Sequence, residues 1–295
     1  MNFRSPSRTW FTLGAILLLG ACSAVKLGYN NSAGIAHTYL INKVSFDADQ
    51  STLLKASLSD LLKWHRDNEL PGLATELQAA QLALAPRNGT VTPVSAGQIQ
   101  ALNHAVRASL RRTANQAAPL IANNMLGLWP NQVQDIQDAL NQANDDYREE
   151  RLMQSPQMRQ KKSAERMTER FERWLGNLNP KQKELIARWS RLDTSGSEDR
   201  YQKRLMRQQQ FMILVNKAAN RQIDQATLSR EVSTLLNAWQ NPINATEKTD
   251  SEHRQKTAID LVVAVMNAAN VEQRNNAAER AAGWAEDFQI LASNS

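Results

Sequence analysis

The chain has 295 residues, of which 42% are apolar, 22% charged and 6% aromatic, with 11 Gly, 9 Pro, one Cys and a formal net charge of +6. Collagen-like and low-complexity proteins contain far more Gly and Pro, and disulfide-rich proteins contain paired cysteines, so these three classes are excluded. At about 150 residues per domain, the length corresponds to roughly one or two domains. The composition therefore predicts a folded body with a buried core.

The first 21 residues have the composition of a signal peptide. Two arginines precede the apolar run Trp10–Ala21, which is shorter than the about 20 residues that a membrane-spanning helix needs. The run leads into Leu19-Gly20-Ala21-Cys22, which resembles the lipobox of bacterial lipoproteins. This resemblance implies cleavage before Cys22, a diacylglycerol on its thiol and palmitate-type acyl chains as a membrane anchor. The alternative is an ordinary secretory signal peptide that happens to contain a cysteine.

The residue after the cysteine indicates where the anchored protein resides. Ser23 resembles the residues that let a lipoprotein be carried to the outer membrane, whereas Asp at this position favours retention in the inner membrane. Two or three acyl chains anchor a protein stably, while one chain is marginal. We therefore expect a lipid-anchored protein on the periplasmic face of the outer membrane, with the inner membrane as the alternative.

Cleavage also changes the charge of the protein. Loss of Arg4 and Arg8 lowers the number of Lys and Arg residues from 35 to 33, against 29 acids, so the formal net charge falls from +6 to +4. A sequence pI near 9.5 often indicates nucleic-acid binding, but an exported protein does not meet nucleic acid. The remaining positive charge favours anionic lipid headgroups or an acidic envelope protein as partners.

The mature chain predicts an all-α fold, an array of antiparallel amphipathic helices without a sheet. Apolar residues recur at helical spacing between sparse Gly and Pro residues. We expect a lipidated tether at 22–34, an N-terminal helical region at 35–192, and a C-terminal region at 193–295 packed on it as one continuous domain. The apolar faces are Leu54, Leu58, Leu61 and Leu62; Ile99, Leu102, Val106 and Leu110; Val133, Ile136, Leu140, Ala143 and Tyr147; Met167, Phe171, Trp174, Leu175 and Leu178; Leu228, Val232, Leu235, Leu236 and Trp239; and Ala277, Ala281, Trp284, Phe288 and Leu291.

Turn-forming sequences separate these helices. Pro86–Val94 has the composition of a loop, and Asp193–Asp199 is the clearest interior linker. Ile259–Met266 is rich in β-branched residues and would also suit a buried strand. Because no Gly or Pro occurs between Pro242 and Gly283, we predict a buried helix at Ile259–Met266.

Several predicted helices begin with a similar capping motif. Asp47, Ser95 and Asn179 each precede a Gln by three residues, and Trp129 precedes Gln132 without a capping side chain. In such a box the cap and the Gln each accept a backbone hydrogen bond from the other residue. The motif resembles the Leu-Thr-x-x-Gln helix starts of Spy-type periplasmic chaperones, although Thr is absent from the capping positions here. That resemblance implies a holdase for unfolded envelope proteins, whereas capping boxes alone are common in helical proteins.

A wider resemblance is to a family of bacterial lipoproteins without an assigned activity, found in proteobacteria. It implies a lipid anchor and a helical body, and no reaction. The lipase-specific foldases are also helical periplasmic proteins, but their Arg-x-x-Phe-Asp-Tyr motif is absent. The residues that carry the resemblance to the lipoprotein family are Cys22-Ser23, Tyr29-Asn30, Phe46-Asp47, Gln50, Trp64-His65-Arg66, Glu69-Leu70-Pro71, Phe171-Glu172, Trp174-Leu175-Gly176, Gln182 and Trp189.

The sequence predicts no catalytic residue, cofactor or metal site. The four histidines, His37, His65, His104 and His253, have no partner at metal-ligand spacing. Gly-rich phosphate loops and the Gly-x-Ser-x-Gly nucleophile motif are absent, and no thiol remains once Cys22 is acylated. We therefore expect a protein that is not an enzyme.

Two sets of polar residues are candidate sites. Asp60, His65 and Glu69 follow one another along a predicted helix and could form a polar cluster with a general base or a pH-sensitive contact. The alternative is a half-buried His65 that Glu69 or a helix-end carbonyl holds by a hydrogen bond. The second set consists of basic stripes that could contact an anionic surface, namely Arg107 and Arg111 with His104, and Arg200, Lys203, Arg204 and Arg207.

These observations favour a lipid-anchored, non-enzymatic binding or assembly factor of the cell envelope, with a chaperone-like holdase as the alternative. The tryptophans at 64, 129, 174, 189, 239 and 284 lie mostly near predicted helix ends. Tryptophans at such junctions usually fill a core, but an exposed pair in a groove would bind peptide or glycan.

Overall fold

The computed structural model describes residues 25–192, 196–238 and 245–294, and these residues are helical without a strand. The predicted all-α fold is confirmed. No helix among them is long and apolar enough to cross a membrane. The helices are α2 Ser32–Ile41, α3 Ala48–Asn68, α4 Leu70–Leu84, α5 Ala96–Leu126, α6 Pro130–Tyr147, the π-helical turn η1 Arg148–Leu152, α7 Pro156–Leu175, α8 Pro180–Leu192, α9 Gly196–Ala219, α10 Gln225–Ala238, α11 Ala245–Asn267 and α12 Val271–Ser293.

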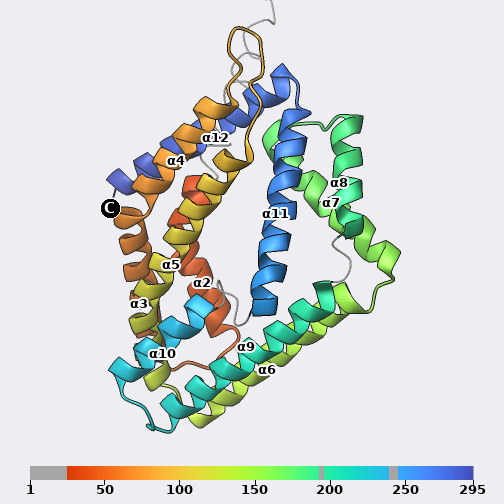
Figure 1. The fold of residues 1–295 in the computed structure, drawn as a ribbon. Coiled ribbons are helices and arrows are strands. Elements are labelled where there is room, and N and C mark those ends of the chain that lie inside the picture. Colours follow the sequence, from red (N-terminus) through yellow and green to blue (C-terminus); the bar gives the residue numbers. More distant parts are fainter. Residues whose placement is uncertain (1–24, 193–195, 239–244, 295) are drawn as a thin grey trace, which may run out of the picture.

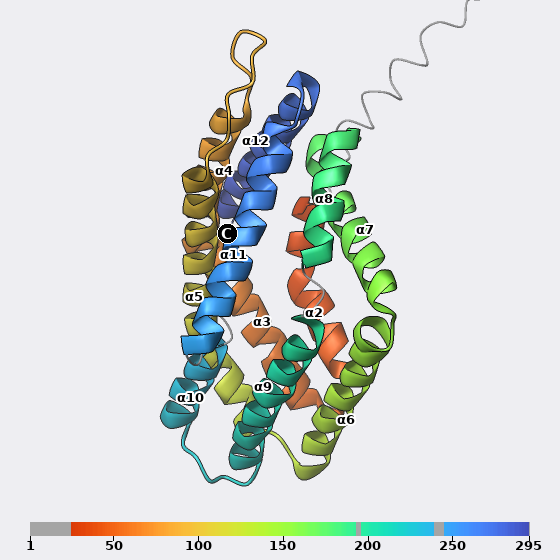
Figure 2. The same ribbon diagram turned by 45° about the vertical axis from the view of Figure 1, so that its right-hand side comes forward.

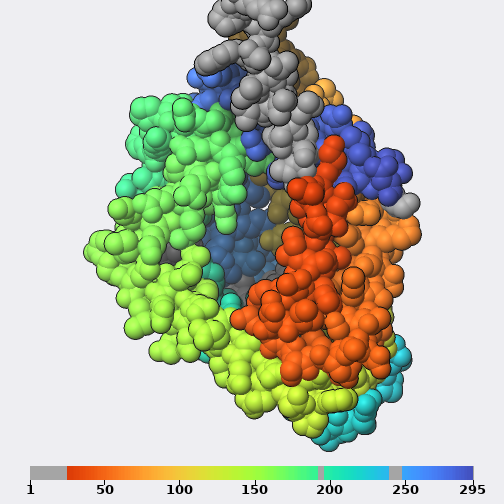
Figure 3. Space-filling view, turned by 180° about the vertical axis from the view of Figure 1, so that it is seen from behind, coloured from red at the N-terminus to blue at the C-terminus, as the bar shows by residue number. Residues whose placement is uncertain are grey.

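The helices form a frame around a hollow. In Figure 1, α3, α4, α5 and α12 make one side of the frame, α6 and α9 the second, and the α7–α8 pair the third. Helix α11 contacts both α5 and α8, and the turned view shows it in front of α5 (Figure 2). From behind, the space-filling view shows the hollow between α2 and the α7–α8 pair, with α11 at its floor (Figure 3).

Two hydrophobic cores stabilise the two ends of the frame. The first joins α5, α9 and α10 around Ala122, Val215 and Leu228. The second joins α7, α8, α11 and α12 around Leu175 and Ile186. Each fully buried aliphatic side chain of this size contributes about 1.5–3 kcal/mol. Because each core combines helices from both sides of residue 193, the regions 35–192 and 193–295 are interleaved.

Glutamines of the capping boxes join helix starts in pairs. Gln50 at the start of α3 and Gln132 at the start of α6 donate to each other's side-chain oxygens over 3.0 and 2.5 Å. At the other end of the frame, Gln273 on α12 donates to Gln182 on α8 over 2.9 Å. Gln132 and Gln182 are completely buried. The predicted boxes at Asp47, Ser95 and Asn179 are confirmed, and each glutamine pair also couples two helices.

A buried guanidinium joins the ends of two helices to a loop. Arg274 on α12 is 1% exposed, and its guanidinium donates to the carbonyls of Ala83, Leu84, Thr92 and Met266 over 2.8–3.3 Å. Three of these carbonyls lie at the carboxyl ends of α4 and α11, where the helix dipole favours a cation. Arg274 therefore holds α4, α11 and the loop after α4 in one place.

Details of the predicted elements differ from the structure. Ile259–Met266 is helical as predicted, within α11. Val106 and Leu110 were expected on a packed stripe of α5, but they are 40% and 53% exposed, because the open frame leaves part of α5 uncovered. Residues 196–199 belong to α9 and not to the linker, since Glu198 and Asp199 in its first turn complement the helix dipole.

Some predictions fall outside the described residues. These are the signal peptide at 1–21, Cys22, residues 193–195 of the linker, and Trp239 at the end of its predicted stripe.

Replacement of Arg274 by Leu should destabilise the protein by about 3–5 kcal/mol, because it leaves four buried carbonyls without a donor. Urea unfolding followed by circular dichroism measures this change. Arg280→Leu on the same helix is the control, since Arg280 is exposed and its replacement should change the free energy of unfolding by less than about 0.5 kcal/mol. Equal effects of the two substitutions would contradict the role of Arg274.

Candidate functional site

The N-terminal segment docks onto α3 through Tyr29, Asn30, His65 and Arg66. Residues 25–30 are helical, and Tyr29 Oη lies 2.8 Å from Nδ1 of His65. Arg66 donates from Nη2 to Asn30 Oδ1 over 2.7 Å, and its Cζ lies 5.6 Å from the centroid of the Tyr29 ring. The part of the expected tether from residue 25 onward is therefore packed on the body.

Burial determines the protonation states of His65 and Tyr29. It lowers the pKa of His65 below its ordinary value, although the charge of Glu69 acts in the opposite direction. It raises the pKa of Tyr29 to about 12, although the charge of Arg66 opposes the shift. Both side chains are therefore neutral near pH 7, and Tyr29 O–H can donate to an unprotonated Nδ1. The partner of the His65 ring is Tyr29, and not Glu69 or a helix-end carbonyl as the sequence suggested.

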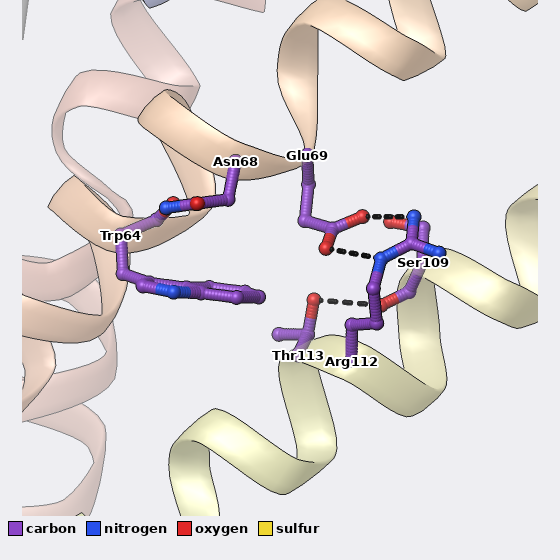
Figure 4. A network of polar contacts seen from close by, with 6 residues as sticks. All are labelled: Trp64, Asn68, Glu69, Ser109, Arg112 and Thr113. Atoms are coloured by element: carbon purple, nitrogen blue, oxygen red, sulfur yellow. Dashed lines mark hydrogen bonds and ion pairs between the residues drawn. The ribbon is translucent and has the colours of Figure 1, made fainter.

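Glu69 forms a buried ion pair with Arg112 (Figure 4). Arg112 donates from Nε and Nη2 to the two carboxylate oxygens over 2.8 and 2.7 Å. The Glu69 side chain is fully buried, whereas that of Arg112 is 57% exposed. Burial by itself would raise the pKa of Glu69, but hydrogen bonds from Arg112 and Ser109 and the nearby positive charges outweigh it and leave the pKa below its ordinary value.

The predicted cluster of Asp60, His65 and Glu69 does not form as a unit. Asp60 is exposed on α3 and takes no part in the contacts that bind the other two residues. His65 faces Tyr29, and Glu69 faces Arg112 on α5. The reason is geometric, because Asp60 lies about 140° around α3 from His65, and Glu69 is the C-cap of α3, where the chain turns into α4. Arg112 is the residue that sequence reasoning missed, since its partner lies 43 positions away.

A second ion pair connects the N-terminal segment to α12. Lys26 Nζ lies 3.4 Å from Oδ1 of Asp287, whose side chain is 2% exposed. The other carboxylate oxygen, Oδ2, is buried without a hydrogen-bond partner. Burial raises the pKa of Asp287, and the hydrogen bond and charge of Lys26 only partly offset this shift. Docking of the segment thus rests on the Lys26–Asp287 ion pair, the Tyr29–His65 hydrogen bond and the contacts of Arg66 with Asn30 and Tyr29.

The basic stripe predicted on α9 is not a free surface. Arg204 donates from Nε to Asn144 Oδ1 over 2.7 Å and from Nη2 to the Ala143 carbonyl over 3.2 Å, so it packs against α6. Lys203 Nζ pairs with Asp199 over 2.8 Å. Arg207 is half-buried on the same helix, and Arg200 is exposed. Arg204 and Lys203 of the predicted stripe therefore contact other residues of the protein, whereas Arg200 lines the basic pocket described below.

The basic stripe predicted on α5 is more exposed than the one on α9. His104 and Arg111 are exposed, and Arg107 is half-buried. The structure places these three residues on a different helix from Arg200, Lys203, Arg204 and Arg207.

An apolar cavity lies between the side of the frame made by α4, α5 and α12 and the helices α7 and α11. Its volume is about 770 Å³, within the roughly 300–1,000 Å³ that is usual for small-molecule sites. Trp174 of α7 and Trp284 of α12 line it, with ring centroids 5.2 Å apart and an interplanar angle of 58°. The charged residues of its lining are Glu76, Arg170, Arg173 and Arg280. The predicted apolar faces of α7 and α12 thus supply a cavity wall as well as a core.

A basic pocket adjoins the apolar cavity along α7. It has a volume of about 430 Å³ and lies between α7, the ends of α6 and α8, η1 and the start of α9. Glu150 is the one acid among its described lining residues. Met167 and Arg170 line both spaces. The basic residues of the lining are Arg151, Arg159, Lys162, Arg166, Arg170 and Arg200.

Several charged side chains of α7 line these two spaces. Lys162, Arg166 and Arg170 recur every four residues, which places them on one helical face. This repeat is a signal that sequence reasoning could have used, but it does not indicate which helices lie opposite. Within the described residues, no group of His, Cys, Asp and Glu side chains could hold a metal ion.

Comparison with known proteins identifies a family. Residues 42–240, more than half of the chain, match the family of unknown function DUF6279. The chain belongs to the DUF6279 family. No curated protein and no solved structure matches it. The DUF6279 match spans α3 to α10 and so includes the Glu69–Arg112 pair and the basic pocket, whereas the apolar cavity is completed by α11 and α12 beyond the matched residues.

Replacement of Glu69 by Gln should lower the free energy of unfolding by about 1–3 kcal/mol at pH 7, because it removes charge-assisted hydrogen bonds at a buried position. The folded pKa of Glu69 is depressed, so this stabilisation is present above the unfolded pKa of about 4.3 and is lost as the pH falls through the folded pKa. Urea unfolding from pH 3 to 8 measures the difference. Glu184→Gln, in an exposed pair with Lys181, is the control and should change little. A pH-independent difference between Glu69→Gln and the natural protein would contradict the assignment.

Replacement of Asp287 by Asn should raise the melting temperature at pH 7. The folded pKa of Asp287 is raised, so its favourable contribution is complete below the unfolded pKa of about 3.9 and is lost as the pH rises through the folded pKa. The natural protein and the variant should therefore have similar stability below about pH 4 and diverge above it. Glu279→Gln, exposed on the same helix, is the control. A lower melting temperature of Asp287→Asn at pH 7 would show that the Lys26 pair outweighs the cost of burial.

Proposed function

We propose that this DUF6279 protein is a lipid-anchored, non-enzymatic binding protein of the cell envelope that holds its ligand or partner in the apolar cavity. The observation that carries the proposal is the cavity itself, about 770 Å³ of mostly apolar space bordered by two tryptophans and three arginines. A hydrophobic space with a few polar groups at its border is the usual form of a binding site. We place the protein on the periplasmic face of the outer membrane, on the grounds of Cys22 and Ser23.

The docking of residues 25–30 supports an anchor close to the folded body. Lys26 and Tyr29 contact α12 and α3, and only four peptide steps separate Lys26 from Cys22. A chain extends at most about 3.6 Å per residue, so Lys26 lies within roughly 14 Å of the proposed lipid attachment point. An anchor at Cys22 would therefore hold the body directly at the membrane surface.

Binding is favoured over catalysis by the roles of the polar residues. His65 and Glu69, the acid–base candidates of the sequence, hold the N-terminal segment and Arg112. The alternative function is a chaperone-like holdase, which the exposed apolar residues Val106 and Leu110 on α5 favour. Suppression of aggregation of an unfolded outer-membrane protein would separate the two functions, since a holdase acts on many clients at stoichiometric amounts.

Anchoring is tested by metabolic labelling with palmitate. The full chain should incorporate label, whereas Cys22→Ala should lose it and remain at the larger precursor size, because Cys22 is the only cysteine of the chain. Ser23→Asp should keep the label and move from the outer-membrane to the inner-membrane fraction of a density gradient. Labelling that persists in Cys22→Ala would contradict the anchor. Unchanged fractionation of Ser23→Asp would contradict the proposed location.

A further inference from the structure

We infer that the apolar cavity and the basic pocket together bind one anionic phospholipid, with an acyl chain in the cavity and the phosphate group at the arginines of α7. This inference rests on the proposed binding function and names the class of ligand. It follows from three properties of the two spaces, which are the polarity of each, their shared wall and a buried donor without a partner.

The first property is the separation of apolar and charged lining. The apolar cavity is walled by aliphatic and aromatic residues such as Leu84, Ile99, Phe171 and Val262. Its charged residues include Arg170 and Arg173 on consecutive turns of α7, both of which are exposed at its edge. An acyl chain suits the apolar walls, because burial of each methylene is favourable in a site of this kind. A ligand with no charge would make no use of the arginines.

The second property is the adjacency of the two spaces. Met167 and Arg170 line both the cavity and the basic pocket, so the two spaces lie on either side of one turn of α7, within the length of one lipid. The basic pocket carries six basic side chains against Glu150. Guanidinium groups match phosphate oxygens in charge and in bidentate geometry. The two spaces therefore complement the two ends of one amphiphile.

The third property is an unsatisfied donor in the basic pocket. Arg159 donates from Nη1 to the carbonyl of Gln154 over 2.8 Å, but its Nε is buried without a partner. The side-chain oxygen of Gln154 is likewise buried without a partner. Buried polar atoms are normally paired, and a phosphate oxygen in this pocket would accept from Nε of Arg159. The pocket thus contains one buried donor that a phosphate oxygen could satisfy, beside six basic side chains.

Photocrosslinking tests the inference with the full lipidated protein in phosphatidylcholine nanodiscs. The probe is lysophosphatidic acid with a diazirine on its acyl chain, and the comparator is the monoacylglycerol with the same chain, which lacks only the phosphate. We expect the lysophosphatidic acid to label peptides of α7 and α12 that contain Trp174 and Trp284. The monoacylglycerol should label them about tenfold less, in line with the loss of charge-assisted hydrogen bonds. Inorganic phosphate in millimolar excess should not displace the lipid, because it cannot fill the apolar cavity.

Substitutions in the two spaces separate the contribution of the phosphate group to binding from that of the acyl chain. Arg170→Gln should reduce labelling by lysophosphatidic acid about tenfold and leave the low labelling by monoacylglycerol unchanged. Ala80→Phe should fill the apolar cavity and reduce labelling by both lipids. Arg254→Gln on α11 is the matched control, since Arg254 is exposed outside both spaces. Circular dichroism and thermal melts establish that each variant is folded before labelling is compared.

The possible results test the anionic ligand separately from the proposed binding function. Equal cavity labelling by both lipids, or labelling that Arg170→Gln does not change, would overturn the anionic ligand and leave the binding function intact. Displacement by inorganic phosphate alone would show an anion site without an acyl chain. Absence of labelling of the Trp174 and Trp284 peptides by either lipid would overturn the phospholipid ligand.

Discussion

The buried guanidinium of Arg274 is the contact on which the arrangement of the C-terminal helices depends. Among the described residues no carboxylate pairs with it, and four backbone carbonyls from α4, α11 and the loop after α4 accept its hydrogen bonds. A cation without water is costly unless its surroundings are negative, and the carboxyl ends of two helices provide that negative potential. Desolvation lowers the pKa of Arg274, yet an arginine retains its proton in proteins. The charge therefore stays in place and fixes where α4 and α11 end relative to α12.

The glutamine pairs act with Arg274 to keep the frame open. A capping box normally stabilises a single helix, but here Gln50 and Gln132 donate to each other across two helices, and Gln273 donates to Gln182 across two others. The two cores also occupy separate ends. Hydrogen bonds at the corners and apolar packing at the ends thus leave the middle without a common core. A hollow of this kind can persist because its border does not rely on contacts through its centre.

The distribution of charge around that hollow connects the fold to the proposed function. Residues 25–30 pack on α3 and α12, so an anchor at Cys22 would place the body near a lipid surface. On the other side of the frame, α7 presents basic residues to one space and apolar residues to the next. A protein held at a membrane with a cavity of this polarity is suited to a lipid that partly leaves the bilayer. The DUF6279 match reaches from α3 to α10, and α12 adds Trp284 and Arg280 to the cavity.

The sequence alone determined the local features. Helical periodicity predicted the all-α fold, and a cap with Gln three residues later predicted helix starts at Asp47, Ser95 and Asn179. These signals depend on neighbours within a few positions, so they can be read from the order of residues. Only the tertiary structure decided which partners distant side chains have. Arg112 pairs with Glu69 from 43 positions away, and Arg274 reaches Ala83 from 191. The cavity arises in the same way, because its walls come from five helices whose separation in space no periodicity encodes.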